Sequence, residues 1–401
     1  MGSRQPGPTG AALAQLLSPF PARDFVARYW EKKPLCVKRS LPAWAARLAS
    51  VHDVDVILAT GRTAANDVSL VRTEAGKSVQ ADVPRGADGA PNIAAIGQAY
   101  ADGYTVVLNS LHRRWPAVAA LRAGLSDDLG HAINMNLYLT PAGAQGFQAH
   151  MDGHEVFVLQ LDGPKRWEVY KPNYRLPLES RTTAGELGKA VLSPELGPGD
   201  LLYIPRGFIH RAHTTDASSL HLTIGVQSWR WVDVLHRAVD ALAEQESSLR
   251  GTVPPAATNA SLARQVRGLL GRMANAADID AAAVAAYRKE MAKQSVPVPG
   301  GRFAAIDRLD EVDGRTVVRH RPGVRCSLSR DKQTSVLQFG ERSLELPATL
   351  ASTLEFVAGH RSFCADSLPG RLSGDAKLKL VRRLLRDGFL VPDDDKGPGA
   401  S

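Results

Sequence analysis

Between about residues 104 and 230 the chain is a series of short apolar runs separated by turn-forming residues. Glycine, proline and aspartate stand between the runs TVVLN, NMNLYLT, EVFVLQL, RWEVY, DLLYIP and LHLTIGV. Short runs rich in β-branched and aromatic side chains, with frequent turns, are typical of strands rather than helices. The pattern therefore predicts an all-β barrel or sandwich in this part of the chain.

Local signals add detail to this segment and to the residues before it. An Asp-Gly turn signal lies in LDGPK, so we expect Glu155–Leu161 and Lys165–Tyr170 to form a hairpin. Helix-like patterning starts at Ala11, and the stretch from Asp53 to Gly103 reads as a mixture of short strands and turns. Residues 1–10 are rich in glycine, proline and serine, and we expect a disordered tail there.

The period of the apolar residues changes after about residue 230. From Trp231 onward they recur at i, i+3, i+4 and i+7, which predicts a helical block over 231–295. A Pro- and Gly-rich linker follows, and 300–395 reads as a small mixed unit with strands at Val324–Leu328 and Thr334–Phe339. Its last helix has Ser373 as N-cap and Gly388 as stop, and a short FLV strand follows, as at the end of a winged helix. The segment 11–230 is then the main domain, with an N-terminal extension.

Composition limits the class of protein. The chain has 401 residues, 44% hydrophobic and 22% charged, with a net charge of +8, which is ordinary for a soluble globular protein. The three cysteines are far apart and form no CxxC pair, so we expect no zinc knuckle or disulfide framework and a reducing compartment. No secretory signal or membrane-length apolar run is apparent, so we expect a cytoplasmic protein without a membrane partner. The positive charge permits an acidic or nucleic-acid partner but gives little support for one.

Two histidines and an aspartate stand at the ends of these apolar runs. His150 and Asp152 are at positions i and i+2, so in a strand their side chains point to the same face. His210 follows the run LLYIP. Two imidazoles and one carboxylate on one side of a metal form the facial triad of non-haem iron(II) oxygenases, with positions left open for a cosubstrate and dioxygen. An unpaired aspartate would also be costly to bury at the start of an apolar strand. We therefore predict that these three residues bind iron and form the catalytic centre.

Other histidines near this cluster receive different interpretations. The i, i+4 spacing of His150 and His154 is that of helical zinc proteases, with Glu155 as a third group. That motif requires His-Glu-x-x-His on a helix, whereas here the middle is MDG and strand-forming residues follow, so we reject this reading. His221 alternates with leucines and is expected to line the pocket, and His213 is expected in a loop.

Lys165 lies just after the expected turn. A lysine in such a place is usually a solvated surface charge, but this one shares a strand face with Trp167 and Val169. A barrel that holds a dicarboxylate needs an inward-facing cation to pair with its far end, and an ammonium group can supply that charge-assisted bond. We therefore single out Lys165 as a candidate ligand of a dicarboxylate cosubstrate.

Long segments of the chain resemble the ribosomal oxygenases, which are JmjC/cupin-type oxygenases that hydroxylate residues of ribosomal proteins. The resemblance rests on FVARYWEKKPL, on NMNLYLTPAGAQGFQAHMDGHEVFVLQLDGPKRWEVYKP, on LGPGDLLYIPRGFIHRA and on SLHLTIGV. It implies an α+β chain: a double-stranded β-helix (the cupin/JmjC jelly roll), a helical dimerisation domain and a C-terminal winged helix. It also implies iron(II), 2-oxoglutarate and dioxygen as cofactor and cosubstrates, and a homodimer.

The resemblance assigns roles position by position. His150, Asp152 and His210 match the iron ligands, and Lys165 matches the residue that binds the distal carboxylate of 2-oxoglutarate. The other matches are Asn136, an active-site asparagine on the cosubstrate side, Thr223 on another wall of the pocket, grouped with Asn136, and Tyr138, a tyrosine that contacts the substrate side chain. A simpler reading of Asn136 and Tyr138 is ordinary strand polarity, because both alternate with leucines.

Two positions depart from the histidine-hydroxylating members of that family. Val107 stands where they carry arginine or glutamine, and Gly225 stands where they carry serine, and both of those polar groups help to hold a target imidazole. Losing both should weaken recognition of histidine, because a polar target group would be left unpaired. Asn109 could compensate for the loss, or the target could be a different side chain.

These observations leave several functions open. The first is hydroxylation of a protein side chain, with a ribosomal protein or a precursor peptide as substrate and no requirement for nucleic acid. Demethylation of an N-methyl-lysine by the same chemistry is an alternative of lower rank. The third is a non-catalytic winged-helix protein that binds nucleic acid and carries a degenerate cupin, with LKLVRRLLRD as its recognition helix. The intact triad and Lys165 argue against that degeneracy.

Overall fold

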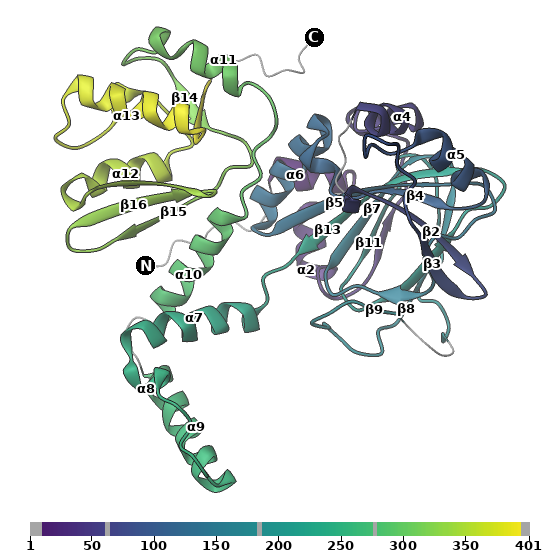
Figure 1. Ribbon diagram of the computed structural model, residues 1–401, viewed down its shortest axis with the longest axis horizontal. Coiled ribbons are helices and arrows are strands. Elements are labelled where there is room, and N and C mark those ends of the chain that lie inside the picture. Colours follow the sequence, from purple (N-terminus) through teal and green to yellow (C-terminus); the bar gives the residue numbers. More distant parts are fainter. Residues whose placement is uncertain (1–9, 61–64, 183–186, 276–278, 394–401) are drawn as a thin grey trace. The chain divides into compact units, whose positions relative to one another are not determined.

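The structure is a computed structural model that describes residues 10–60, 65–182, 187–275 and 279–393. The chain divides into two compact units, one reaching to Ser228 and the other starting at Trp229 (Figure 1). Residues 1–9 of the tail expected at 1–10, and the last residues of the sequence, 394–401, lie outside the described residues. Within the described residues, no helix is long and apolar enough to cross a membrane.

The first unit is mainly β-structure with helices before and between the strands. Its helices are α1 (Ala11–Leu17), α2 (Ala22–Arg28), α3 (Ala43–Ala46), α4 (Val51–Thr60), α5 (Ile93–Ala101) and α6 (Pro116–Leu129). Its strands are β1 (Leu35–Val37), β2 (Val68–Glu74), β3 (Lys77–Ala81), β4 (Thr105–Leu108), β5 (Ala132–Thr140), β6 (His150–Met151), β7 (Glu155–Asp162), β8 (Lys165–Tyr170), β9 (Arg181–Thr182), β10 (Glu195–Leu196), β11 (Leu201–Ile204), β12 (Ile209–His213) and β13 (Ser219–Gln227).

These strands form two antiparallel sheets with a cavity between them. The larger sheet has the order β1-β11-β7-β13-β5-β4-β2-β3, and the smaller has the order β10-β8-β12-β6-β9. Side chains from both sheets line the same cavity, which is the arrangement of a β-sandwich folded as a jelly roll. The expected double-stranded β-helix is thus present as antiparallel sheets around a pocket.

The prediction of a hairpin at the Asp-Gly turn is wrong. Strand β7 pairs with β11 and β13 in the larger sheet, whereas β8 pairs with β10 and β12 in the smaller one. The turn therefore carries the chain from one sheet to the other. A turn signal fixes only the local bend, and the partners of each strand are fixed by longer-range pairing.

The expectation of strands and turns between residues 53 and 103 is only partly right. Strands β2 and β3 form a hairpin there, but α4 and α5 are helices. The N-terminus of α5 is capped by Asn92, whose side chain accepts a hydrogen bond from the Ala95 N–H. Ile96 of this helix is buried in the core.

The main core of this unit lies on the face of the larger sheet that is turned away from the cavity. Helices α1, α2 and α6 cover it, and Phe25 packs against Phe157 and Tyr203 with ring centroids 5.5 and 4.7 Å away. On β7, Phe157 belongs to this core, while Val156 and Val158 point to the cavity side. Both faces of the strand are thus buried, which explains its continuous apolar run.

The second unit contains helices followed by small sheets. Its helices are α7 (Trp231–Gln245), α8 (Ser247–Arg250), α9 (Asn259–Ala274), α10 (Ile279–Lys293), α11 (Arg302–Asp307), α12 (Ala351–Gly359) and α13 (Gly374–Asp387). Its strands are β14 (Val318–His320), β15 (Cys326–Arg330), β16 (Thr334–Phe339), β17 (Arg342–Pro347), β18 (Ser362–Phe363) and β19 (Leu390–Pro392). They form the sheets β18-β14-β19 and β15-β16-β17.

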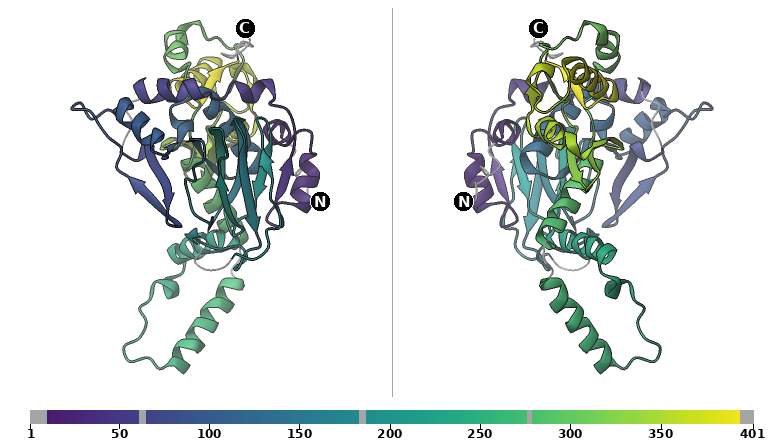
Figure 2. Two further views of the ribbon diagram at one scale, coloured as in Figure 1. Left: turned by 90° about the vertical axis from the view of Figure 1, so that its right-hand side faces the viewer. Right: turned by 90° about the vertical axis from the view of Figure 1, so that its left-hand side faces the viewer.

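Local signals in this unit agree with the structure. Ser373 caps α13 by accepting a hydrogen bond from the Ala376 N–H, and Gly388 ends the helix with a φ of 85°. One face of α13 is buried in a separate core with α12 and the small sheets. Figure 2 shows α9 standing away from the rest of this unit, and none of its residues is buried.

Candidate active site

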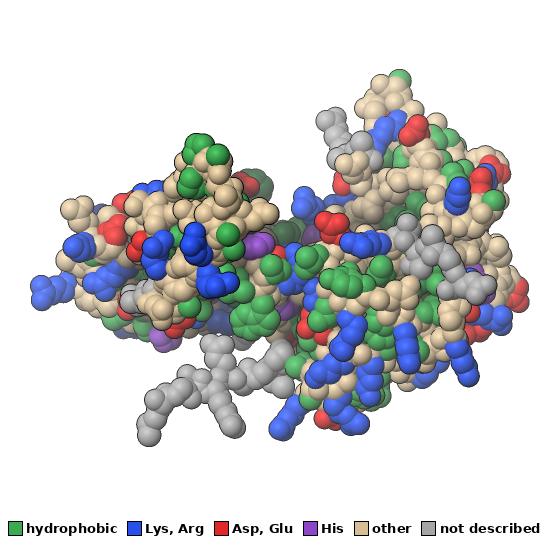
Figure 3. All heavy atoms as spheres, turned by 90° about the horizontal axis from the view of Figure 1, so that it is seen from below, with side chains coloured by type: hydrophobic (Ala, Val, Ile, Leu, Met, Phe, Trp, Pro, Cys, Tyr) green, Lys and Arg blue, Asp and Glu red, His purple; other side chains and the backbone are tan. Residues whose placement is uncertain are grey.

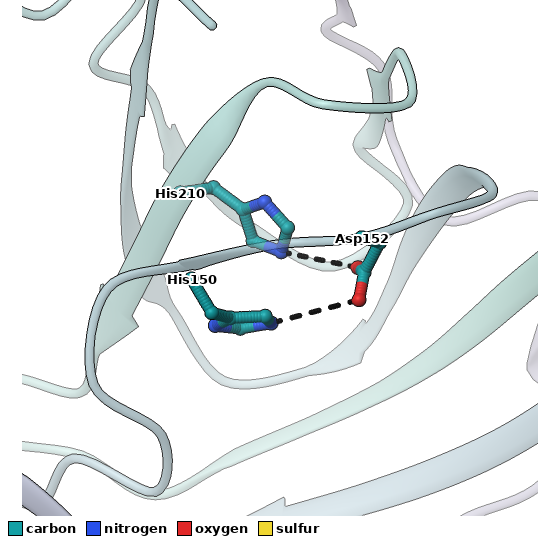
Figure 4. A group of neighbouring side chains, drawn as sticks. All are labelled: His150, Asp152 and His210. Carbon is teal, nitrogen blue, oxygen red and sulfur yellow. Dashed lines mark ion pairs between the residues drawn. The ribbon is translucent and has the colours of Figure 1, made fainter. Parts of the chain in front are cut away.

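His150, Asp152 and His210 come together in the cavity, as the sequence predicts. His150 on β6 and His210 on β12 are paired directly across the smaller sheet, and Asp152 follows β6. The Nε2 atoms of His150 and His210 lie 4.0 and 3.5 Å from the carboxylate oxygens of Asp152. One nitrogen or oxygen from each residue falls within 4.8 Å of the others, and the side chains point toward one another (Figure 4).

Hydrogen bonds fix which ring nitrogen of each histidine faces the aspartate. Nδ1 of His150 lies 2.9 Å from the carbonyl oxygen of Gln148, and Nδ1 of His210 lies 3.1 Å from that of Phe208. A carbonyl oxygen only accepts, so each Nδ1 carries the proton. Each Nε2 therefore has a free lone pair directed toward Asp152, which is the state a metal ligand needs.

The electrostatics of the group favour the same protonation states. Burial, together with His150, lowers the pKa of His210 to about 4. Burial alone would raise the pKa of Asp152, but the His210 and His150 imidazoles outweigh it and hold that pKa below its ordinary value. At neutral pH the cluster thus presents a neutral His210 and an ionised carboxylate.

Two loops hold Asp152 in place. The Ser180 side chain hydrogen-bonds to its carboxylate, and the Ser180 oxygen accepts a hydrogen bond from the Gly153 N–H at 2.9 Å. The Gly207 N–H donates to the Asp152 carbonyl oxygen at 2.9 Å. The loop between β11 and β12 therefore contacts Asp152 at Gly207 and His210 at Phe208.

A buried charged network anchors that same loop. Glu155 accepts a short hydrogen bond from the Tyr203 hydroxyl and a 3.3 Å bond from the Arg206 N–H. The Arg206 guanidinium pairs with Glu31 at 2.8 Å, and the Glu31 N–H donates to Tyr203. Sequence reasoning missed this network, although Glu155 is a charged residue at the start of a mainly apolar, buried strand.

The cavity that holds the triad has a volume of about 270 Å³. The residues assigned from the sequence to the metal, the cosubstrate and the substrate tyrosine line it, together with others from both sheets. The lining is Thr105, Asn134, Asn136, Tyr138, Gly146, Phe147, His150, Asp152, His154, Val156, Val158, Lys165, Trp167, His210, Arg211, Ala212, His221, Thr223, Gly225 and Gln227.

Lys165 is buried at one end of this cavity, with 4% of its surface exposed. Its Nζ donates to the Thr140 hydroxyl at 2.8 Å, and burial lowers its pKa to about 7. Within the described ranges, no carboxylate forms an ion pair with it. Two more polar atoms beside it, Nε1 of Trp167 and Nδ1 of His221, are buried without a hydrogen-bond partner.

Asn136, Tyr138 and Thr223 share one wall of the cavity. Thr223 on β13 is directly opposite Asn136 on β5, and His221 is opposite Tyr138. The Tyr138 and His221 rings are stacked with centroids 4.8 Å apart. The Asn136 Oδ1 accepts from the Ser110 N–H at 2.9 Å, so this side chain also secures the loop after β4.

The three residues that the sequence linked to a changed substrate preference lie in different parts of the structure. Val107 is buried on β4 and does not line the cavity. Asn109 uses both hydrogens of its amide, which go to the Asn66 carbonyl at 3.0 Å and the Ser69 hydroxyl at 2.8 Å. Asn109 is also not among the residues that line the cavity, so the structure does not support the suggestion that Asn109 compensates for Val107. Gly225 lies on the cavity wall, beside the His154 ring.

The rejected zinc-protease reading stays rejected, because His150 lies on a strand and Glu155 points to the opposite side of β7. His221 does line the pocket. His213 was expected in a loop, but it forms the last residue of β12 and pairs with Arg166. That expectation was wrong because the strand continues past the metal ligand.

Comparison with known proteins identifies similar chains. Residues 119–234 match the JmjC domain. Ribosomal oxygenase 2 of Bos taurus is 30% identical over 319 residues, which cover 73% of this chain and 68% of that protein. Ribosomal oxygenase 1 of Gallus gallus is 36% identical over 242 residues, or 56% of this chain and 38% of that protein.

Other relatives extend the comparison. The bifunctional lysine-specific demethylase and histidyl-hydroxylase NO66 of Aedes aegypti is 32% identical over 254 residues. The chain spans only 39% of that protein's length, so it matches a part of it. Among solved structures, YcfD, a ribosomal oxygenase from Escherichia coli in complex with cobalt and 2-oxoglutarate, gives a TM-score of 0.58 at 16% identity. The match covers 94% of this chain and 99% of YcfD, and it shows a shared fold.

Proposed function

This chain belongs to the ribosomal oxygenase family, and on that premise we propose that it is an iron(II)- and 2-oxoglutarate-dependent oxygenase that hydroxylates a side chain in a protein. The observation that carries the proposal is a single cavity that holds both a metal-binding cluster and a group able to bind an anion. The His-Asp-His cluster presents three metal-binding atoms, and Lys165 presents a buried cation with no carboxylate partner among the described residues.

The residues fit the proposed cofactor and cosubstrate. His150, Asp152 and His210 would hold the iron through two imidazole Nε2 atoms and a carboxylate, the donor set of a facial triad. A dicarboxylate with one end at the metal would place its other end near Lys165, where it would also meet the unpaired polar atoms of Trp167 and His221. A buried unpaired polar atom is costly, so the pocket favours a polar ligand at this end.

The chain's own groups then have defined tasks. The iron and 2-oxoglutarate supply the oxidation itself when they are bound. Lys165, whose ammonium group is held by the Thr140 hydroxyl, binds the distal carboxylate, with Asn136 and Thr223 on the adjoining wall. The Phe208 and Gln148 carbonyls orient the two imidazoles, and Ser180 holds the carboxylate. We assign Tyr138, which lines the same cavity, to contact with the substrate.

For the substrate we propose a side chain of a ribosomal protein, with a precursor peptide as the second choice. The names of the Bos taurus and Gallus gallus relatives support the first. The relative named NO66 is described as both a demethylase and a hydroxylase, so removal of an N-methyl group from lysine is the candidate to test against it. Release of formaldehyde would distinguish that reaction from hydroxylation.

We propose that nucleic acid is not required. On α13 the apolar residues Leu380, Val381, Leu384 and Leu385 are buried in the core of the second unit. Figure 3 shows Lys and Arg side chains gathered toward the lower right of the face in view with a few Asp and Glu among them, but a net charge of +8 over the chain is weak evidence for nucleic-acid binding. A winged-helix role for residues 300–395, dimerisation through 231–295 and a cytoplasmic location stay proposals as well, the last supported by three free cysteines.

The proposal is tested by loading the full chain with iron(II) without oxygen and then adding air, 2-oxoglutarate and peptides that tile the ribosomal proteins of its source. We expect a mass gain of one oxygen atom on a peptide, and its loss in Asp152→Ala. Lys165→Ala should raise the KM for 2-oxoglutarate, whereas Lys171→Ala, at an exposed lysine, should not. Failure of the wild-type protein to bind iron would overturn the proposal.

A further inference from the structure

Gly225 is a glycine in the middle of strand β13, where its backbone does not require one. Its neighbours Ile224 and Val226 are fully buried, and the residue pairs with Asn134 on one side and Val156 on the other. Glycine weakens a strand interior and often marks a place where another group approaches closely. The group that approaches here is the imidazole of His154.

The His154 ring lies next to the position that a side chain at residue 225 would occupy. A Cβ atom at position 225 would be 3.1 Å from Cε1 of the ring, 3.4 Å from Nδ1 and 3.6 Å from Nε2. A side chain at position 225 would therefore require the imidazole to shift by at least a few tenths of an ångström. Glycine at 225 and histidine at 154 form a matched pair, in which one makes the space that the other fills.

The imidazole is held in one orientation and keeps one nitrogen free. Nδ1 of His154 lies 3.2 Å from the carbonyl oxygen of Glu155, which only accepts hydrogen bonds, so Nδ1 carries the proton. Nε2 is left as an acceptor without a partner among the residues that the structure describes. The ring lines the same cavity as the metal-binding cluster.

His154 stands at the end of the cavity opposite to Lys165. Lys165 acts electrostatically on His221, and Gly225 is four residues further along the same strand, roughly 13 Å away. Gln227, which is exposed, lines the cavity beyond Gly225, so this end is the open one. Asn134 is also there, but its amide is occupied by Ser110 and Asn136. The imidazole is therefore a prominent free polar group where a peptide side chain would enter.

We propose that His154, seated on Gly225, hydrogen-bonds to the target side chain and makes the site select targets with an N–H or O–H donor. Such targets include the imidazole, amide, guanidinium and hydroxyl side chains, in preference to aliphatic ones of similar size. This inference rests on the proposed function. It also changes the interpretation of Gly225, which stands where the histidine-hydroxylating members of the family carry serine. The His154 ring fills the space of that serine side chain, so a serine at position 225 would contact His154.

The test uses the full iron-loaded chain and the best tiled peptide, made in versions that differ only at the oxidised residue. We expect donor-bearing residues to be oxidised at least tenfold faster, in kcat/KM, than an apolar residue of similar size. His154→Phe keeps a ring but removes the acceptor, so this preference should fall about tenfold, whereas His154→Gln should retain most of it. Comparing two peptides within one variant cancels differences in iron loading.

Gly225→Ala supplies an independent arm. The added methyl group displaces the ring, so Gly225→Ala alone should reduce the preference for donor-bearing targets. In a chain that already carries His154→Ala, adding Gly225→Ala should reduce this preference no further. An unchanged preference in His154→Phe, or additive effects of the two substitutions, would overturn the inference while leaving the oxygenase intact. If iron binds but no tiled peptide gains oxygen, the proposed function itself fails. His52→Gln, at an exposed position on α4, is the control for a histidine outside the cavity.

Discussion

Lys165 has a consequence for the pH dependence of cosubstrate binding. Burial lowers its pKa to about 7, so above that pH the side chain is mainly neutral when the pocket holds no anion. A carboxylate needs the ammonium form, so binding above pH 7 must take up a proton. The dissociation constant of 2-oxoglutarate should therefore rise by up to tenfold per pH unit between about pH 7 and 9.

Calorimetry of 2-oxoglutarate binding to the iron-loaded protein without oxygen measures this directly. Titrations at pH 8 in two buffers of different ionisation enthalpy report the proton uptake. Lys165→Arg is the matched control, because a guanidinium stays charged over the whole range and should flatten the dependence. A dissociation constant that does not change between pH 7 and 9 would contradict the assignment of Lys165.

Glu155 should make the folded protein less stable as the pH rises. Burial raises its pKa to about 7, despite the hydrogen bond from Tyr203. Between about pH 4.5 and 7 the folded chain then binds more protons than the unfolded one, so stability falls as pH rises through this window. The difference in free energy of unfolding between Glu155→Gln and wild type should therefore shift in favour of the variant by about 2–3 kcal/mol from pH 5 to pH 8.

Denaturant unfolding at a series of pH values checks this. Glu168→Gln is the control, because the Arg211 hydrogen bond lowers the pKa of Glu168 and its contribution is lost only in more acidic solution. A constant difference between Glu155→Gln and wild type over this range would show that the buried carboxylate does not titrate there.

The metal-binding residues could be predicted from the sequence, but the residues that contact and orient them could not. His150 and Asp152 are two residues apart, so the i, i+2 pattern places their side chains on one face, and His210 reaches them because β12 pairs with β6 at His150. Ser180 and His154 act through contacts with residues distant in sequence, at Gly153 and Gly225. No spacing rule reveals such contacts. Gly225 was noticed only as a missing hydroxyl, since the His154 ring beside it cannot be foreseen without the fold.

Among the elements, the loop between β11 and β12 links the metal-binding residues most directly. Gly207 adopts a φ of 88°, and a Cβ there would lie 2.6 Å from Pro177 and 3.0 Å from the Tyr174 carbonyl oxygen. Gly207→Ala should therefore lower the free energy of unfolding by about 1–3 kcal/mol and weaken iron binding, because the loop also holds Asp152 and His210.

A matched glycine tests whether the effect belongs to this loop. Gly97 lies inside α5 with open space around it, so Gly97→Ala should raise the free energy of unfolding by up to about 1 kcal/mol. Thermal unfolding and iron titration of both variants make the comparison. Equal iron affinity in Gly207→Ala and wild type would argue against a positioning role for the loop.

For the helices and strands, the sequence predicted the type of most elements but not which strands pair with each other. The apolar runs became strands, and the capping signals of Ser373 and Gly388 mark the ends of α13. The Asp-Gly turn was read as a hairpin because a turn carries no information about which sheet the next strand joins. The helices α4 and α5 were missed because they are short and their apolar faces pack on the core of the larger sheet.

The two units have separate cores, and among the described residues the second unit leaves large apolar side chains exposed. Trp231 and Leu235 on α7 are 83% and 58% exposed, and Val266 and Leu270 on α9 are 54% and 58% exposed. Each pair is spaced i, i+4, so each forms one stripe on its helix. A helix with no buried residue has little to stabilise it in a single copy.

A second copy of the chain is the partner we expect on these stripes, in line with the proposed dimerisation through 231–295. Leu270→Glu should raise the dissociation constant of the dimer by at least 100-fold, because a charge would be buried at the contact. Arg264→Glu reverses a charge on the opposite face of α9 and should leave it unchanged. Light scattering coupled to size-exclusion chromatography measures both. A wild-type chain that is monomeric at micromolar concentration would require another protein on these stripes, since exposed apolar surface of this kind marks an interaction site.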